Sequence, residues 1–353
     1  MHALCIRDRR LCRARMLHCF RMKPFDFLAV GDIVTEPFIR LKDAKVTCNI
    51  DNENCTISMR WGDKIPYDSA VVCRAVGNSP NAAVSAARIG LSTGLATDIG
   101  NDAIGKGNHE QLKKEKISTK HVRIHKCMVS NYHYVLSYES ERTILVKHEE
   151  YDYRFPTMNP APRFMYLSSL AANSLPYHKE IESYLAKHPE TFLTLQPGTF
   201  QMKLGVTDLK GLYERANLLV INKEEAARIL GLPESGNEIK DLLEKTRAFG
   251  PKAVIITDGR AGAYSFDGSE MLHIPMYPDD REPIERTGAG DAFASTVTAA
   301  LALGKPFREA LLWGPINSMA VVQEIGAQKG LLTRKAIEEF LAKAPESYRV
   351  TPL

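Results

Sequence analysis

Residues 283–294, PIERTGAGDAFA, have types and spacing that suit phosphate chemistry. Gly288, Ala289 and Gly290 lead into Asp291, which opens an alanine-rich run that predicts a helix. The first N–H groups of a helix have no intrahelical partner and lie at the positive end of the helix dipole, so this turn suits an anion. Glycine also lets the backbone approach a phosphate closely. The Asp291 carboxylate then predicts a base that takes a proton from the group attacking that phosphate.

The elements that must position this turn follow from the pattern of apolar segments. Residues 25–34, FDFLAVGDIV, form a continuous apolar run that predicts a buried strand. From residue 163 onward, strand and helix patterns alternate, and this order predicts a mostly parallel central sheet with helices on both faces. We expect a single α/β domain over residues 23–353. The predicted strands are 164–170, 192–198, 217–222 and 253–259, and the predicted helices are 177–187, 223–230, 238–248, 290–303, 307–324 and 334–344.

Two segments interrupt this alternation, at about residues 35–75 and 129–147. Both contain short β-type runs broken by polar turns, and we expect them to form one small antiparallel sheet that acts as a lid. Exposed lid strands need covering, which favours a homodimer through the lids. Between the two segments we expect a helix capped by Ser79, with Pro80 at its first position and Gly90 beyond its end.

The composition is that of an ordinary soluble enzyme. The formal charge of +4 over 353 residues is misleading, because residues 1–23 carry seven Arg and Lys against Asp8 and the remainder is therefore slightly acidic. We expect neither nucleic-acid binding nor a membrane span, which needs roughly 20 apolar residues. The basic segment 1–22 lacks the apolar core of a secretory signal, and we expect it to be a disordered extension or to precede the true start of the protein.

The seven cysteines are odd in number and form no C-x-x-C pair. This usage favours reduced thiols in the cytoplasm over a disulfide framework or a zinc site. A P-loop is the competing phosphate motif, but the near match at residues 100–107 ends in Gly107, where the motif needs the hydroxyl that holds Mg²⁺.

Four motifs together resemble the PfkB, or ribokinase-like, family of kinases. The run RTGAGDAF at residues 286–293 is similar to the family's C-terminal signature, and GNSPN at 77–81 resembles its N-terminal glycine-rich turn. NKEE at 222–225 matches N-x-x-E, and TDGRAG at 257–262 resembles T-x-G-x-x-G. The resemblance implies an ATP-dependent kinase that phosphorylates a hydroxyl of a sugar or sugar-like molecule. A nucleoside kinase of the same fold, or a sensor without turnover, remains an alternative.

On the phosphate side, the resemblance implies that Asp291 is the catalytic base. The N–H groups of Gly288, Ala289 and Gly290 would form the anion hole. Asn222 and Glu225 would position Mg²⁺ through water, although N-x-x-E is also a helix-capping box and both roles can hold at once. The residues implied to border the nucleotide are Asn222, Thr257, Gly259, Gly262 and, near the adenine, Asn317.

On the acceptor side, the resemblance implies substrate contacts from Gly77, Asn78 and Asn81. Glu36 stands where family members carry an Asp that binds sugar hydroxyls, and its extra methylene shifts those contacts. The family's Asp at the start of the C-terminal signature is Glu285 here. Members activated by K⁺ build the ion site in that region, so dependence on a monovalent cation stays open.

Overall fold

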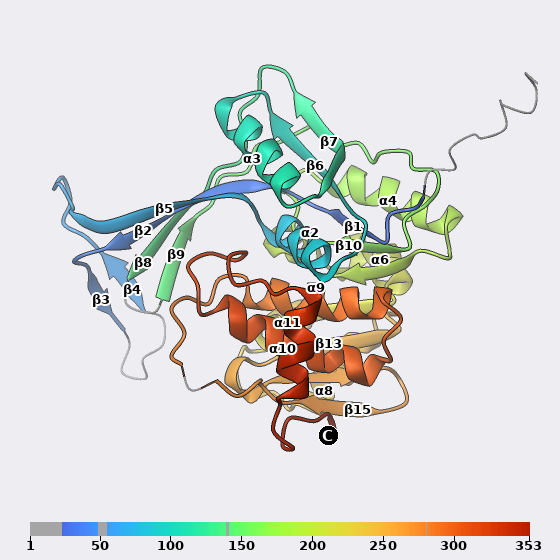
Figure 1. Ribbon diagram of the computed structural model, residues 1–353. Helices are drawn as coiled ribbons and strands as arrows, with labels where there is room; N and C mark the ends of the chain where they lie inside the picture. Colours follow the sequence, from blue (N-terminus) through green and yellow to red (C-terminus); the bar gives the residue numbers. More distant parts are fainter. Residues whose placement is uncertain (1–22, 49–54, 139–140, 280) are drawn as a thin grey trace, which may run out of the picture.

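The computed structural model describes residues 23–48, 55–138, 141–279 and 281–353; the predicted extension 1–22 therefore lies outside the described residues. Its centre is a ten-stranded sheet, and neighbouring strands run parallel from β7 through β13. The predicted α/β class with a mostly parallel sheet is confirmed (Figure 1). In spatial order the strands are β16 (Thr351–Pro352), β15 (Met271–Ile274), β14 (Ala263–Phe266), β13 (Ala253–Thr257), β12 (Leu218–Asn222), β11 (Phe192–Leu195), β10 (Phe164–Leu167), β1 (Phe27–Val30), β6 (Thr93–Gly100) and β7 (Ser118–His125).

Alternate side chains of each central strand feed two separate cores, because successive residues of a strand point to opposite faces. Phe27 and Ala29 of β1 pack with residues of α2, α9 and α10, whereas Leu28 and Val30 pack with residues of α4, α6 and α8. The helices are α2 (Asn78–Ile89), α3 (Ala103–Lys114), α4 (Leu175–Lys187), α5 (Thr199–Asp208), α6 (Lys210–Arg215), α7 (Lys223–Ile229), α8 (Ile239–Arg247), α9 (Ala289–Ala302), α10 (Phe307–Val321) and α11 (Arg334–Ala342), with a 3₁₀ turn η1 (Gly259–Ala261). Both faces of the sheet are therefore covered, as a continuously apolar strand requires.

A separate four-stranded sheet projects from one end of the molecule (Figure 1). It comprises β5 (Tyr67–Val76), β2 (Val34–Leu41), β8 (Tyr134–Tyr138) and β9 (Glu141–Leu145), and a small hairpin of β3 (Lys45–Thr47) and β4 (Thr56–Ser58) extends from it. The prediction of a purely antiparallel small sheet is wrong in one respect. β2 and β8 are parallel, because they come from the two separate insertions rather than from one hairpin.

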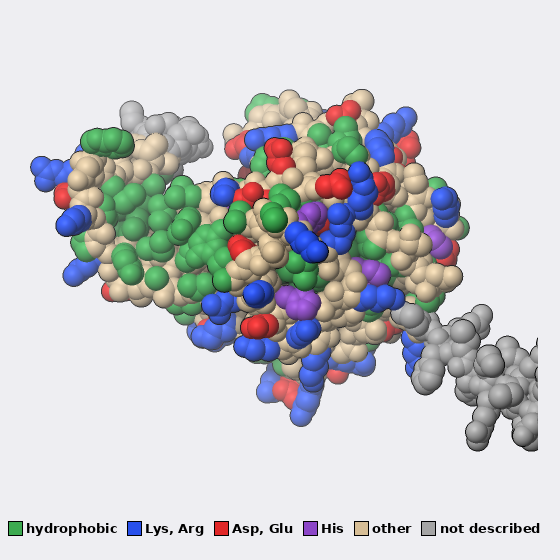
Figure 2. Space-filling model, turned by 90° about the horizontal axis from the view of Figure 1, so that it is seen from above, with side chains coloured by type: hydrophobic (Ala, Val, Ile, Leu, Met, Phe, Trp, Pro, Cys, Tyr) green, Lys and Arg blue, Asp and Glu red, His purple; other side chains and the backbone are tan. Residues whose placement is uncertain are grey.

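The pairing register gives this small sheet two distinct faces. Cross-strand neighbours Phe38, Val135 and Ile144 share the face that carries Glu36, since residues two apart on one strand lie on the same side. Tyr134 and Leu145 form a pair on the opposite, outward face. Figure 2 shows hydrophobic side chains gathered over this projecting part of the molecule.

Cys48 and Cys55 form a disulfide, whereas Cys73 and Cys127 are free thiols. The prediction that all cysteines are reduced is therefore wrong for this pair. Cys48 directly follows β3 and Cys55 directly precedes β4, and the pairing of these two strands brings the cysteines together in a way that their sequence spacing does not reveal. Across the described ranges, we find no helix with the length and apolar character needed to cross a bilayer.

Candidate active site

Asp291 lies in the first turn of α9, and its carboxylate is held by three side-chain amides. Asn81 Nδ2 donates to Oδ2 at 2.8 Å, and Asn78 Nδ2 donates to Oδ1 at 2.9 Å. Gln196 Nε2 donates to Oδ1 at 3.2 Å. Burial raises the pKa of this carboxyl above its usual value, the three amides oppose that shift, and the nearby charge of Glu36 adds to it. A raised pKa suits a carboxylate that must accept a proton near neutral pH.

The turn before Asp291 presents backbone N–H groups to the same space. Gly288 is the N-cap of α9 with φ of 78°, and a Cβ at this position would lie 2.3 Å from the Ala327 Cβ. Only glycine fits such a conformation and such an approach. The Ala289 N–H donates a long hydrogen bond to the Arg286 carbonyl at 3.4 Å, and the other N–H groups of the first helical turn lack intrahelical acceptors. This arrangement can stabilise negative charge next to the Asp291 carboxylate.

Glu285, just before this turn, is nearly fully buried. Its Oε1 accepts hydrogen bonds from the Thr287 N–H and hydroxyl, and its Oε2 accepts from the Gly326 N–H at 3.3 Å. The Arg142 guanidinium lies 3.8 Å from the same carboxylate. The carboxylate therefore links the anion-binding turn to the loop at Gly326 and to strand β9.

A polar pocket opens in front of Asp291. The acceptor residues expected from the sequence all line it, namely Glu36, Gly77, Asn78 and Asn81, and Asn222, Glu225, Thr257, Gly288 and Gly290 line it as well. Arg142 and Ile144 of β9 face it from the small sheet. The structure thus brings the start of α2, the start of α9 and the small sheet around one space.

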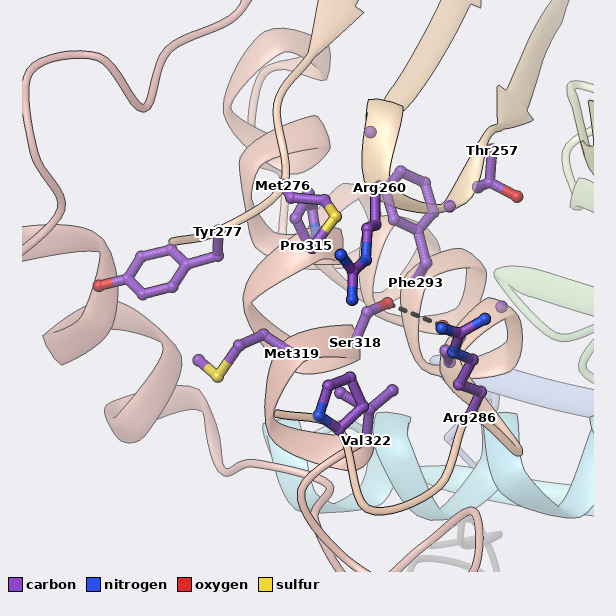
Figure 3. Close-up of a pocket in the computed structure, with 15 residues that line it drawn as sticks. Thr257, Arg260, Met276, Tyr277, Arg286, Phe293, Pro315, Ser318, Met319 and Val322 are labelled. Atoms are coloured by element: carbon purple, nitrogen blue, oxygen red, sulfur yellow. Dashed lines mark hydrogen bonds between the residues drawn. The ribbon is translucent and has the colours of Figure 1, made fainter. Parts of the chain in front are cut away.

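A second, largely apolar pocket adjoins the first. It is lined by Phe293, Met276, Pro315, Met319 and Val322, with Thr257, Gly259 and Gly262 at its border. Figure 3 shows these side chains around a common space, with Thr257 and Tyr277 on opposite sides and Arg260 between them, while Arg286 lies on the same side as Thr257. Thr257, Arg286 and Gly290 line both pockets, so the two spaces meet at the glycine-rich turn before Asp291.

Asn317, predicted to lie near the adenine, lines neither of these two pockets. Its side chain is fully buried, with Nδ2 donating to the Thr296 hydroxyl at 2.7 Å and Oδ1 accepting from the Leu332 N–H at 2.8 Å. The next residues on α10, Ser318 and Met319, line the apolar pocket instead. Consecutive side chains of a helix point about 100° apart, and the sequence alone does not show which of them faces the pocket.

Asn222 and Glu225 form a complete capping box at the start of α7. The Glu225 N–H donates to Asn222 Oδ1 at 2.7 Å, and the Asn222 N–H donates to Glu225 Oε2 at 2.9 Å. Burial raises the pKa of the Glu225 carboxyl. Within the part of the chain that the structure describes, no three His, Cys, Asp or Glu side chains gather as a metal site. One carboxylate and one amide suit a hydrated Mg²⁺ that ATP carries, and they do not form a closed cage.

The predicted N-cap of α2 is also corrected. Gly77 is the N-cap residue, with φ of 115°, and Ser79 lies inside the helix. The Ser79 hydroxyl donates to the Val30 carbonyl at 2.6 Å, which ties α2 to the end of β1. Because α2 starts two residues earlier than predicted, Asn78 and Asn81 stand one turn apart and both reach Asp291.

Three residues of the site were missed by the sequence reasoning: Gln196, Arg142 and Arg286. Gln196 directly follows strand β11, so the rule that ligands bind beyond the carboxyl ends of parallel strands could have identified it. Arg286 lies within the glycine-rich turn that was singled out. Nothing in the sequence around Arg142 distinguishes it from an ordinary residue of a small-sheet strand.

The family model for "pfkB family carbohydrate kinase" matches residues 46–334. The chain is 24% identical over 320 residues to an ATP-dependent 6-phosphofructokinase of Thermoanaerobacterium thermosaccharolyticum, covering 87% of this chain and 91% of that one. It is 26% identical over 271 residues to ribokinase of Bacillus subtilis, covering 75% and 87% of the two chains.

Solved structures show the same fold. Arabidopsis thaliana ribokinase, solved with ribose and ATP, superposes with a TM-score of 0.75 at 18% identity, covering 90% of this chain and 99% of that one. The nucleoside kinase of Methanocaldococcus jannaschii gives a TM-score of 0.73 at 19% identity, covering 91% of this chain and 100% of that one. Taken with the match over residues 46–334, the chain belongs to the pfkB family of carbohydrate kinases.

Proposed function

We propose that this protein is an ATP-dependent kinase that phosphorylates a hydroxyl of a sugar or sugar-like small molecule. One observation carries the proposal: an apolar pocket and a polar pocket meet at Gly290, next to the buried Asp291 carboxylate. The apolar pocket suits a nucleotide base, the polar pocket suits a hydroxyl-rich acceptor, and the junction suits the transferred phosphoryl group.

The residues of the chain supply the chemistry in the following way. Asp291 takes the proton of the acceptor hydroxyl as that oxygen attacks the terminal phosphorus. The N–H groups of Gly288, Ala289 and Gly290 stabilise the charge that develops on the transferred group, and ADP leaves in line. Asn222 and Glu225 would hold a hydrated Mg²⁺ that accompanies ATP, and that ion would neutralise part of the phosphate charge.

The lining of the polar pocket favours a sugar over a nucleoside. Its side chains are mostly charged or amide groups, with Ile144, Val220 and Ile221 as apolar members. Across the described part of the chain, no aromatic residue lines this pocket. A nucleoside base needs an apolar or aromatic platform, whereas sugar hydroxyls need the donors and acceptors that are present.

ADP formation across a panel of pentoses, hexoses, 2-keto-3-deoxy acids and nucleosides tests the choice of acceptor. We expect a sugar or sugar derivative to give the highest kcat/KM. A higher value for a nucleoside would replace the sugar assignment with the nucleoside kinase alternative. ATP-dependent product formation with any member of the panel would exclude a sensor without turnover.

The substitution Asp291→Asn tests the catalytic assignment. General base catalysis contributes about 10²–10⁴-fold, so we expect kcat to fall by at least that factor. The amide keeps the shape of the carboxylate, and binding of ATP and of the acceptor by calorimetry should persist. Near-normal turnover in this variant would refute the assignment of Asp291 as the catalytic base.

We further propose that the outward face of the small sheet pairs two copies in a homodimer. Val72, Tyr134 and Leu145 on this sheet are 50%, 46% and 52% exposed, and they leave an apolar surface uncovered in the single chain. Sedimentation velocity should give a dimer at micromolar concentration, and Leu145→Lys should give a monomer. A wild-type monomer at 50 µM would refute the pairing.

The predicted cytoplasmic location stays a prediction.

A further inference from the structure

We infer that His133 is a positioning residue that fixes the Glu36 carboxylate in the acceptor pocket. The inference rests on the proposed function, because it treats Glu36 as a ligand of acceptor hydroxyls. His133 lies just before strand β8, in the segment YHYVLSY, and does not itself line the pocket. It therefore acts through Glu36 and not on the substrate.

The contact between the two side chains is buried and directional. His133 Nδ1 lies 3.2 Å from Glu36 Oε1, and the side chains are only 9% and 10% exposed. An ionised carboxylate can only accept, so Nδ1 carries the proton and donates. His133 Nε2 is buried and has no hydrogen-bond partner in the part of the chain that the structure describes. The carboxylate of Glu36 is therefore the polar group that orients this ring.

A second histidine–carboxylate pair packs against the His133 ring. His148 Nδ1 lies 2.9 Å from Asp32 Oδ2, and the Tyr153 hydroxyl donates to the same carboxylate at 2.8 Å. The two imidazole rings are 4.9 Å apart between centroids. The array Glu36–His133–His148–Asp32 thus runs from the acceptor pocket to the end of β1, where the small sheet joins the central sheet.

The backbone holds His133 against the residue that precedes Glu36. The His133 N–H donates to the Thr35 carbonyl at 3.1 Å, and the Thr35 N–H donates to the Asn131 carbonyl at 3.3 Å. The imidazole and the carboxylate consequently move as one unit if the small sheet moves. The distance between the imidazole and the carboxylate is therefore set by these local backbone hydrogen bonds and does not depend on a bound acceptor.

The length of Glu36 explains why a brace is needed. The family resemblance places an Asp at this position, and Glu has one more rotatable bond, so its carboxylate can adopt more positions when it is held less firmly. A donated hydrogen bond from a buried, ring-packed histidine removes that freedom and leaves the carboxylate aimed at the pocket. Fixing a ligand group in its bound geometry before binding increases affinity.

Steady-state kinetics with the best acceptor of the panel tests this role. His133→Leu removes the donor, and we expect the acceptor KM to rise about tenfold or more while the ATP KM changes less than about twofold, because the lost hydrogen bond acts on acceptor binding alone. His133→Asn places an amide N–H where Nδ1 stands and should restore the acceptor KM to within about threefold.

A matched control exists in His188, whose Nδ1 also lies 3.2 Å from a glutamate oxygen, that of Glu190, at the exposed end of α4. His188→Leu should leave both KM values unchanged. In a Glu36→Asp background, the shorter side chain needs less bracing, so His133→Leu should raise the acceptor KM by a smaller factor. Equal factors in both backgrounds, or a parallel rise of both KM values, would overturn the inference.

A spectroscopic measurement tests the contact without turnover. Long-range ¹H–¹⁵N correlation spectra of the histidine rings should show the proton of His133 on Nδ1, with the signal assigned from its loss in His133→Asn. A proton on Nε2 alone would refute the contact to Glu36. If the contact is present but no acceptor is phosphorylated, the kinase proposal fails while this geometry stands.

Discussion

Gly288 and Gly290 lie two residues apart in the same turn but have different surroundings, so alanine at each position should separate stability from catalysis. At Gly288, φ is 78° and an added Cβ would lie 2.3 Å from the Ala327 Cβ and 2.7 Å from its Cα. At Gly290, within helix α9, the nearest atom to an added Cβ is Gln196 Nε2 at 3.9 Å. The first substitution strains the fold, whereas the second meets no obstacle in the protein itself.

The magnitudes follow from these surroundings. A non-glycine residue in the left-handed region costs about 1–2 kcal/mol, and the clash with Ala327 adds about 1–3 kcal/mol as the loop shifts. For a chain of this length, Gly288→Ala should lower Tm by roughly 3–7 °C, from the usual entropy of unfolding per residue. Gly290→Ala replaces a glycine in a helix and should keep or slightly raise Tm, by about 1 °C.

Gly290→Ala should lower the activity although it keeps or slightly raises Tm. Its added methyl group points toward the space where the two pockets meet, and it should push the phosphoryl group away from the N–H donors. Removing one such donor lowers kcat by about 10²–10³-fold, and we expect a loss near the lower end of that range. Differential scanning calorimetry and initial rates at saturating ATP measure the two effects. A fully active Gly290→Ala variant, or an unchanged Tm in Gly288→Ala, would refute the assignment of this turn.

Three further predictions address other residues. Asn222→Ala should lower the free energy of unfolding in urea by about 1 kcal/mol through loss of the α7 cap, while Asn222→Asp retains it. Burial lowers the pKa of His178 from 6.5 to about 4. The contribution of the neutral, buried ring to the free energy of unfolding is therefore complete above pH 6.5 and falls by at most about 3 kcal/mol as the pH drops toward 4. His178→Gln should flatten that profile, and an unchanged profile would exclude His178 as its source. Because the Glu285 carboxylate already accepts bonds from Thr287 and Gly326, turnover in potassium chloride and in choline chloride should agree; strong activation by K⁺ would contradict this reasoning.

The alternation of strands and helices from β10 to β13 could be predicted because these buried parallel strands are mostly apolar runs. The antiparallel edge of the sheet, β14 to β16, was not predicted, since these strands are short and carry polar residues. Pairing of β2 with β8 depends on how two distant insertions meet, and local sequence carries no information about that meeting. The Cys48–Cys55 disulfide was missed for a different reason: it closes a local hairpin, and a spacing of seven residues does not by itself indicate one.

The phosphate end of the candidate site was predictable, because glycines at a helix start have a direct physical meaning. The glycine-rich turn, the capping box and the two asparagines all lie at one site, as their motifs implied. The orientation of Asn317 could not be predicted, because the place of a residue on a helix does not show which way its side chain points when both faces of that helix are buried. Gln196 and His133 were not among the predicted site residues because their importance comes from a partner far away in the chain, Asp291 for one and Glu36 for the other.

The hydrogen bonds to Asp291 also bear on how the protein is made. Its partners Asn78 and Asn81 lie 213 and 210 residues earlier in the chain. During synthesis from the N-terminus, both amides emerge long before the carboxylate that they hold, so the candidate active site is assembled late. Contacts between residues so distant in sequence form slowly, and chains stalled before α9 lack α9 and α10, two of the helices that cover one face of the sheet. Truncated products should therefore expose apolar surface and depend on chaperones, even when most of the sheet has been synthesised.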